Sequence, residues 1–175
     1  MNQSLLARCQ SGEPQAWRQL YERFAGSVYR WSVGFGLDRS SAEEATQEVF
    51  LTATKRIGSC ESEAQLPAWF FQTTRRHAAN ARRIRWVKRV VGWGESNHED
   101  LEDPLQQSAD LPLSELSYAV RRVLGRIPMR FVEVLLLHDL DGRTREEIAD
   151  MLGISPGTVA SRLRTARELF EKEWS

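Results

Sequence analysis

The sequence predicts an all-α protein of two small helical domains joined by a flexible acidic linker, with a helix-turn-helix in the C-terminal domain. Three observations predict this fold. Apolar residues recur every three or four positions in several segments, and helix start and stop signals flank those segments. The charged residues are also grouped by sign along the sequence, although the formal net charge is +0. Residues 68–90 contain seven Arg or Lys and no acid, whereas residues 91–120 contain seven acids and no Arg or Lys. A basic block is typical of a surface that faces a polyanion, and an acidic block with prolines is typical of a solvated linker.

Composition excludes several classes of protein. The 175 residues, 41% of them hydrophobic, suffice for real cores. No run of about 18 apolar residues and no signal peptide is present, so we expect a cytoplasmic protein without membrane insertion. Cys9 and Cys60 lack the spacing of a zinc site, and neither a disulfide nor a metal site is expected. Because His77, His98 and His138 are scattered, a metal-dependent nuclease is not favoured, and no enzyme activity or cofactor is expected.

Two helices are predicted at the N-terminus. A short helix follows Leu5 and ends near Gly12, and a longer helix begins at Pro14 and breaks at Gly34 and Gly36. The apolar stripe of the longer helix, which we expect in the core, comprises Trp17, Leu20, Tyr21, Phe24, Val28 and Trp31.

A third helix can begin with a capping box at Ser40 and Glu43 or at Ser41 and Glu44. Its predicted buried residues are Val49, Ala53 and Ile57. The opposite face is acidic and polar with one exposed leucine, and it comprises Glu44, Gln47, Glu48 and Leu51. From the residues alone, plain solvation with a helix-dipole benefit explains this face.

A fourth helix, which Pro67 can start, carries the basic block. It combines Trp69, Phe70, Phe71 and Trp86 with seven cations. Rings that stack on bases, together with cations that follow phosphates, suit single-stranded nucleic acid. We expect the aromatic side chains to lie in the core and the arginines, which no acid accompanies over 23 residues, to face DNA.

Residues 143–170 predict a helix-turn-helix. Thr144 and Glu147 form a capping box, Gly153 can end the first helix, and Ser155 and Pro156 suit the start of the second. The apolar residues expected to face inward are Ile148, Ala149 and Leu152 in the first helix and Val159, Leu163, Ala166 and Phe170 in the second.

The second of these helices has the composition of a DNA-reading helix. Helical geometry places Ser161, Arg164 and Thr165 opposite its apolar stripe, toward a major groove, and Arg162 and Arg167 at the flanks, toward phosphates. Residues 155–167 contain no acid, as a phosphate-facing surface requires. An ordinary helical hairpin in a core is the alternative.

The order of these features resembles the extracytoplasmic-function group of sigma factors of bacterial RNA polymerase, over nearly the whole chain. EEATQEVFLTA is similar to the family's polymerase-clamp segment and PAWFFQTTRRHAANARR to its minus-10 segment. GTVASRLRTAR lies close to the family's usual GTV-x-SRL-x-x-AR, in region 4. The resemblance implies that residues 1–88 form region 2, residues 89–112 a linker and residues 113–175 region 4.

The resemblance also implies a function. The chain would be an alternative sigma factor that binds core RNA polymerase, recognises minus-35 and minus-10 elements, and promotes DNA melting. An anti-sigma factor is an expected partner, and the linker is expected to pass through the polymerase. The implied clamp-helix contacts on the largest polymerase subunit are Glu44, Gln47, Glu48 and Leu51. The implied minus-10 contacts, with a flipped-base pocket near 58–66, are Ser59, Glu61, Arg75, Arg76, Asn80, Arg82 and Arg83. The minus-35 contacts are Thr158, Ser161, Arg162, Arg164, Thr165 and Arg167.

Three positions depart from the family pattern. The family usually has Asn at the position of Arg76 and Asp at that of Asn80, so the minus-10 helix is more cationic here. Ala160 stands where Lys or Arg is frequent, which leaves fewer side chains for base readout. A stand-alone helix-turn-helix regulator is the alternative function. It is less favoured because the N-terminal half shows a basic aromatic helix and no evident ligand domain.

Overall fold

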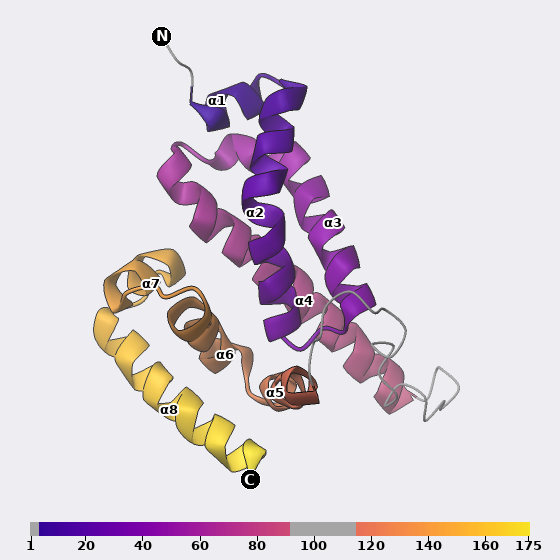
Figure 1. The fold of residues 1–175 in the computed structure, drawn as a ribbon, viewed down its shortest axis with the longest axis vertical. Helices are drawn as coiled ribbons and strands as arrows, with labels where there is room; N and C mark the ends of the chain where they lie inside the picture. Colours follow the sequence, from indigo (N-terminus) through magenta and orange to yellow (C-terminus); the bar gives the residue numbers. More distant parts are fainter. Residues whose placement is uncertain (1–3, 92–114) are drawn as a thin grey trace.

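The computed structural model describes residues 4–91 and 115–175, and every regular element in these ranges is a helix or a helical turn. The prediction of an all-α fold with two helical domains is therefore confirmed. Most of the predicted linker, residues 92–112, lies outside the described residues. Figure 1 shows the N-terminal domain and the C-terminal domain side by side.

The N-terminal domain is built on three long helices that pack against one another. It contains α1 (Leu5–Gln10), α2 (Pro14–Gly34), α3 (Arg39–Arg56) and α4 (Leu66–Val91). Two short turns, η1 (Ile57–Ser59) and η2 (Glu63–Gln65), join α3 to α4. Aromatic rings fill the core: Phe24 stacks on Phe70 with ring centroids 4.5 Å apart, and Trp31 meets Phe71 edge-on at 5.1 Å.

The predicted apolar stripes are largely confirmed, with two exceptions. Tyr21 is half exposed and lies against Phe50 at the domain surface. Trp86 is 61% exposed, so its predicted place in the core is wrong. Figure 1 shows the physical reason, because the last turns of α4 extend past the ends of α2 and α3, the helices on which the earlier turns of α4 pack.

The start of α3 also differs from the prediction. Neither capping box at Ser40 or Ser41 forms; instead Asp38 caps the helix and accepts a 2.8 Å hydrogen bond from the Ser41 backbone N–H. The Ser41 hydroxyl donates to the same carboxylate. An aspartate before the first turn satisfies the free N–H groups and favours the positive end of the helix dipole, so the helix begins at Arg39.

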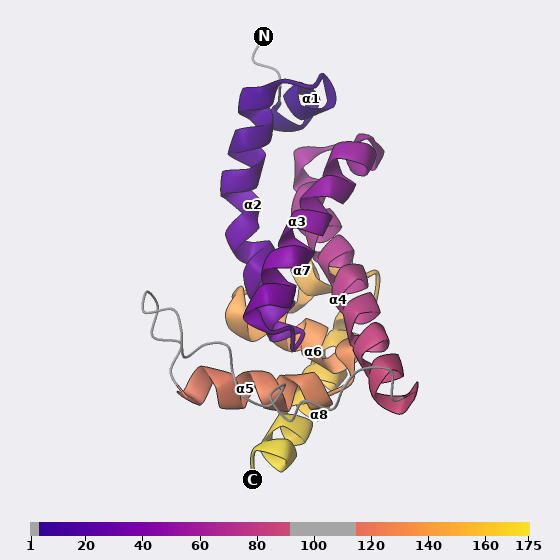
Figure 2. The same cartoon turned by 90° about the vertical axis from the view of Figure 1, so that its right-hand side faces the viewer.

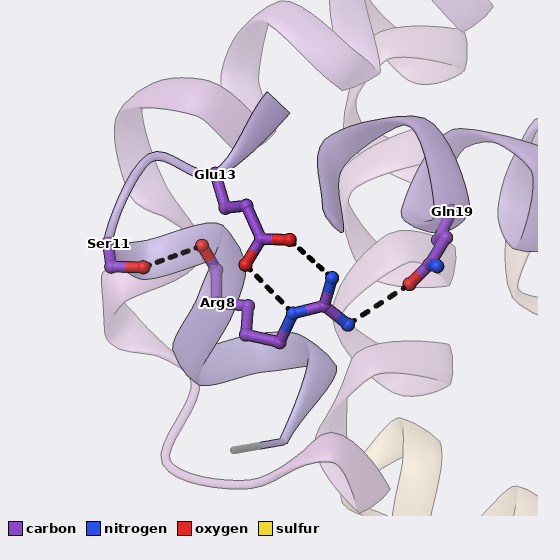
Figure 3. Close-up of polar contacts among 4 residues, drawn as sticks. All are labelled: Arg8, Ser11, Glu13 and Gln19. Atoms are coloured by element: carbon purple, nitrogen blue, oxygen red, sulfur yellow. Dashed lines mark hydrogen bonds and ion pairs between the residues drawn. The ribbon is translucent and has the colours of Figure 1, made fainter. Parts of the chain in front are cut away.

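The short helix α1 is tied to α2 by a polar cluster (Figure 3). Arg8 donates two hydrogen bonds to the Glu13 carboxylate, one of them 2.9 Å long from Nε, and a longer one of 3.4 Å to Gln19. The Ser11 hydroxyl donates to the Arg8 carbonyl at 2.9 Å. The hydrogen bonds from Arg8 lower the pKa of Glu13 below its ordinary value. These contacts fix the turn that leads into Pro14 and α2.

The C-terminal domain contains α5 (Glu115–Arg126), α6 (Met129–Leu135), α7 (Arg145–Leu152) and α8 (Pro156–Trp174). A π-helical turn, η5 (Leu136–Leu140), follows α6 directly. The sequence did not predict this turn. It is closed by the Asp141 N–H, which donates to the Leu136 carbonyl at 3.0 Å. The turn places Asp139 beside α8 and Asp141 beside α2, where each accepts a side-chain hydrogen bond.

The helix-turn-helix is confirmed in its local detail. Thr144 and Glu147 form the reciprocal capping box of α7, with hydrogen bonds of 3.2 and 2.9 Å. Gly153 takes the left-handed conformation, with φ 67°, that ends α7. Ser155 caps α8 by accepting from the Thr158 N–H at 3.1 Å, and Pro156 occupies the first turn.

The C-terminal domain packs against α2 and α4, as both views show (Figure 1, Figure 2). The Trp31 indole N–H donates a 2.7 Å hydrogen bond to Asp141 across this boundary. The backbones of Gly36 and Gly125 approach so closely that a Cβ at Gly36 would lie 2.9 Å from the Gly125 Cα. The two domains therefore form a close interface in this structure.

Candidate polymerase and nucleic-acid interfaces

One face of α3 remains open to solvent. Ala45 and Val49 turn toward α2 and α4 and are buried. The opposite side chains are all exposed, and Leu51 is 53% exposed. Within the described residues no ion pair occupies this face, which comprises Glu44, Gln47, Glu48 and Leu51. An exposed leucine within an acidic rim has the composition of a small protein-binding surface.

A hollow of about 460 Å³ lies beside this face, between α3 and α4. It is lined by Glu48 and Leu51 on one side and by Arg76 and His77 on the other. His77 Nε2 lies 3.1 Å from the Thr52 hydroxyl. Burial lowers the pKa of His77, although the nearby Glu48 opposes this shift. Sequence reasoning did not single out His77 for this site, because its partner comes from another helix.

The loop between α3 and α4 holds two of the predicted minus-10 residues. Ser59 and Glu61 are exposed there. Hydrogen bonds hold the loop backbone next to them: the Glu61 N–H donates to the Gln65 side chain at 2.9 Å, and the Gln10 side chain donates to the Cys60 carbonyl at 3.1 Å. The loop is thus anchored to α1 while its polar side chains face outward. Their contact with DNA stays a prediction.

The predicted DNA-binding side chains of α4 fall into two neighbouring rows. Arg76, Asn80 and Arg83 are exposed, and Arg83 donates to Asn80 at 3.4 Å. Arg75 and Arg82 instead face the C-terminal domain. In this structure the side chains of the first row are accessible to a single DNA strand, whereas those of the second row contact the C-terminal domain.

The expectation that the α4 arginines face no acid is wrong for Arg75. Its Nε lies 2.5 Å from Oε2 of Glu133, a residue of α6 that is only 3% exposed. Arg82 Nη2 donates to the Gly125 carbonyl at 2.6 Å and to the Ile127 carbonyl at 3.4 Å. The acid and the carbonyls belong to the other domain, so a count of charges along the local sequence could not find them.

The recognition helix α8 presents its predicted groove-facing residues outward. Ser161 and Arg164 are exposed and Thr165 is partly exposed, while Val159 and Leu163 are buried beneath them. Among the described residues, no hydrogen bond or ion pair engages the Arg164 side chain. Arg164 is therefore available for a base edge.

The flanking arginines of α8 do have acid partners, which corrects the expectation drawn from the local sequence. Arg162 Nη1 donates to Glu133 Oε1 at 2.9 Å, and Arg167 Nη2 donates to Asp139 Oδ1 at 2.9 Å. Burial alone raises the pKa of Asp139, but hydrogen bonds from His138 and Arg167 outweigh it and hold the pKa below its ordinary value. Glu133 and Asp139 thus orient both arginines along the helix flank.

No group of His, Cys, Asp or Glu in residues 4–91 and 115–175 is arranged to hold a metal ion. Cys9 and Cys60 are both buried and free, and burial raises the pKa of each thiol. Across the same ranges, no helix has the length and apolar composition needed to cross a membrane.

Comparison with known proteins assigns the family. Residues 20–88 match the Sigma-70 region 2 family profile, and residues 117–170 match the profile of Sigma-70, region 4. The two matches cover the two domains that the fold defines, in the order that the family requires. The chain belongs to the sigma-70 family of RNA polymerase factors. It is an alternative sigma factor of the extracytoplasmic-function group, which initiates transcription with core RNA polymerase on promoter DNA.

Relatives match over nearly the full length. The RNA polymerase sigma factor NccH of Alcaligenes xylosoxydans xylosoxydans is 25% identical over 174 residues, which cover 95% of this chain and 91% of that protein. The ECF RNA polymerase sigma factor SigM of Mycobacterium tuberculosis is 28% identical over 166 residues, covering 95% and 81%.

Solved structures share the fold. CnrH in complex with the cytosolic domain of CnrY superposes with a TM-score of 0.70 at 22% identity, covering 96% of this chain and 93% of that one. The sigma factor RpoE, in complex with the anti-sigma factor NepR from Bartonella quintana, gives a TM-score of 0.61 at 20% identity, covering 89% and 94%.

Proposed function

We propose that this sigma factor opens promoter DNA through three separate surfaces, without covalent chemistry. The observation that carries the proposal is the order of exposed faces along the chain: an acidic face with Leu51 on α3, a cationic row on α4, and a polar face on α8. Flipping a base costs a few kcal/mol, and stacking in a protein site offsets about 1–3 kcal/mol per base. A protein that holds the unpaired strand better than the duplex therefore melts DNA by differential binding, and is not an enzyme.

The α3 face docks on the clamp helices of the largest polymerase subunit. Leu51 is the apolar anchor, and Glu44, Gln47 and Glu48 form the polar rim that sets orientation. The exposure of all four side chains supports this assignment. An acidic rim requires a basic partner surface, and salt weakens the docking as it weakens any exposed charge pairing.

The α3–α4 loop and α4 hold the non-template strand of the minus-10 element. Ser59 and Glu61 border the pocket for a flipped base, and Arg76, Asn80 and Arg83 follow the nearby phosphates. Arg75 and Arg82 complete the cationic surface once they leave the C-terminal domain. Arg76 lines the hollow beside the α3 face, which supports a continuous path from polymerase to strand.

The recognition helix α8 locates the minus-35 element. Ser161, Arg164 and Thr165 enter the major groove, and Arg164 makes the main base contact because Ala160 offers no long polar side chain. Thr158, Arg162 and Arg167 lie at the flanks and position the helix on phosphates.

Residues 95–110 of the linker lie outside the described residues; their deletion is expected to impair initiation more than promoter binding.

An anti-sigma factor is a further proposed partner, as found for RpoE with NepR. A groove of about 700 Å³ between α2, α5, η5 and α8 suits an amphipathic helix, because its lining is mainly apolar and charged side chains rim it. Its apolar lining includes Val33, Val120, Leu124, Leu135, Leu136, Leu140 and Phe170. We place the protein in the cytoplasm, where polymerase and promoter DNA meet.

Promoter melting tests the proposal. A promoter with 2-aminopurine in the minus-10 non-template strand fluoresces when that base unstacks. Core polymerase plus this chain should raise the fluorescence, and neither alone should. A stand-alone regulator would instead bind duplex DNA tightly without core polymerase and give no such signal, which would overturn the proposal.

A further inference from the structure

The α3–α4 loop, which contains η1 and η2, is attached to α1 at two points. At one point the Gln10 side chain donates from Nε2 to the Cys60 carbonyl at 3.1 Å. At the other point the Glu63 carboxylate accepts hydrogen bonds from the backbone N–H groups of Leu5 and Leu6, the second of them 3.4 Å long. Figure 1 shows α1 beside this loop. The loop is therefore held by a helix that is far from it in the sequence.

The two attachments lie at opposite ends of α1. Leu5 and Leu6 begin the helix, and Gln10 is its last residue. The N–H groups of a first helical turn lack partners within the helix, and the Glu63 carboxylate provides an acceptor for two of them. A helix of 6 residues is about 9 Å long, so α1 spans the loop from η2 to the end of η1.

The helix α1 is in turn held against α2. The hydrogen bonds between Arg8 and Glu13 fix the turn between the two helices (Figure 3). The Trp17 indole N–H donates to the Cys9 carbonyl at 3.0 Å. Because α2 holds α1 and α1 holds the loop, the loop has a defined position relative to the core of the N-terminal domain.

The Gln10 attachment lies between the two predicted base-pocket residues of the loop. Cys60 is only 4% exposed, whereas Ser59 and Glu61 on either side of it are exposed. Gln10 binds the Cys60 carbonyl from the inner side, and its amide contacts neither Ser59 nor Glu61. A shift of the Cys60 backbone would therefore move both outward-facing residues together.

We propose that α1 positions the α3–α4 loop for base recognition, and that Gln10 and Glu63 set the selectivity for the minus-10 base without touching DNA. A loop that becomes ordered only on binding loses conformational entropy at that moment. The hydrogen bonds from α1 order the loop in advance. This inference rests on the proposed assignment of Ser59 and Glu61 to the minus-10 strand.

A loosened loop should lose base selectivity more than affinity. It can adjust to a base that the native loop rejects, so the preferred base loses its advantage. Arg76 and Arg83 stay in place on α4 and bind phosphates whatever the base. The ratio of affinities for two bases therefore reports on the loop, whereas a smaller amount of folded protein affects all bases equally.

Gln10→Leu and Glu63→Ala remove the two attachments independently. Leucine is similar in size to glutamine but donates no hydrogen bond, and alanine at position 63 leaves the N–H groups of Leu5 and Leu6 without this acceptor. Glu63→Gln is the rescue variant, because its amide oxygen can still accept from these groups. It loses the negative charge that lies 3.5 Å from Arg23, so it separates the backbone hydrogen bonds from the ion pair.

Val28→Ala is the control for stability. Val28 is 0% exposed in α2 and takes part in neither attachment of the loop. Loss of its methyl groups should lower the free energy of unfolding, which urea denaturation measures for every variant. The base selectivity of Val28→Ala should nevertheless remain native, because its loop stays attached to α1.

The experiment assembles each full-length variant with core polymerase. The affinity is measured for sets of four single-stranded oligonucleotides that differ only in the base at one minus-10 position. Gln10→Leu and Glu63→Ala should reduce the ratio between the preferred and the poorest base by about 3- to 10-fold, because a hydrogen bond contributes a factor of that order. Glu63→Gln and Val28→Ala should keep the native ratio.

A native ratio in either Gln10→Leu or Glu63→Ala would overturn the role of that residue, and a native ratio in both would overturn the positioning role of α1. If one of the two variants fails to fold, the other still decides. An equal fall in Glu63→Gln and Glu63→Ala would contradict the role of the backbone hydrogen bonds. An equal fall in Val28→Ala would show that lost stability explains the effect.

Failure of the proposed function looks different. The native holoenzyme would then show no preference among the four bases at any minus-10 position. A native holoenzyme that selects a base, combined with an unchanged selectivity in Gln10→Leu and Glu63→Ala, refutes the positioning role alone.

Discussion

Arg162 of α8 donates a 2.9 Å hydrogen bond to Glu133 of α6, joining the recognition helix to the buried centre of the C-terminal domain. Glu133 is 3% exposed, so its charge is stable there only because arginines neutralise it. The pair adds a polar link to the packing of Val159 and Leu163, whose burial turns Arg164 outward on the opposite face of α8.

Glu133→Gln should destabilise the C-terminal domain. The amide nitrogen cannot accept a hydrogen bond from an arginine, and Arg162 loses its counter-charge, so the free energy of unfolding should fall by about 1–3 kcal/mol. Urea denaturation measures this. Glu146→Gln, at an exposed position of α7, is the control and should stay within about 0.5 kcal/mol of the native chain. Equal losses in both variants would contradict the structural role of Glu133.

Arg164→Ala should cost about 1–3 kcal/mol of promoter binding and relax the minus-35 preference, if Arg164 makes a bidentate guanine contact. Arg167→Ala, at the helix flank, should weaken binding evenly across sequences, because phosphate contacts carry no base information. Titration of the holoenzyme against a panel of minus-35 variants separates the two effects. An unchanged base preference in Arg164→Ala would refute its role in base readout.

Leu51→Ser should weaken binding to core polymerase by about 1–3 kcal/mol, because a central apolar anchor carries much of an interface's energy. Val90→Ser is a suitable control, since Val90 is also exposed and lies on α4, away from the acidic face. Competition of each variant with native protein for core polymerase gives the affinities. If both substitutions have the same effect, the α3 face is not the docking surface.

His77 should make stability depend on pH. Burial lowers the pKa of His77 in the folded state below the ordinary value of 6.5, so the unfolded chain binds its proton more readily. The stabilising contribution is present above the unfolded pKa and is lost as pH falls through the lower, folded pKa. The native melting temperature should therefore drop more between about pH 7.5 and pH 5.5 than that of His77→Gln, which stays neutral. Parallel curves would exclude this contribution.

Features that depend on residues within one helical turn of each other could be predicted from the sequence. The capping box of Thr144 and Glu147, the αL residue Gly153 and the cap Ser155 each involve neighbours in the chain, and each is present in the structure. The exposed face of α3 was readable for the same reason, because helical periodicity separates Leu51 from the buried Val49.

Contacts between elements that are far apart in the sequence could not be predicted. The residues around Arg75 in the sequence do not indicate that Glu133 of the other domain contacts it. A search for acids nearby in the sequence therefore finds no ion-pair partner for Arg75. The residues of the π-helical turn at Leu136–Leu140 would also suit an ordinary α-helix, so the sequence does not distinguish the two. Only the backbone hydrogen bonds of the structure do. Trp86 shows a further limit, because amphipathic periodicity does not tell where the partner helices end.

Run-off transcription tests directly whether this chain gives core polymerase its promoter specificity. Core polymerase is incubated with a promoter library randomised upstream of a fixed transcribed segment, with and without this chain, and the transcribed templates are sequenced. We expect transcripts only when the chain is present, from templates enriched in two separate elements, with the upstream element altered when Arg164→Ala is used. No chain-dependent transcripts, or transcripts without sequence enrichment, would contradict this expectation.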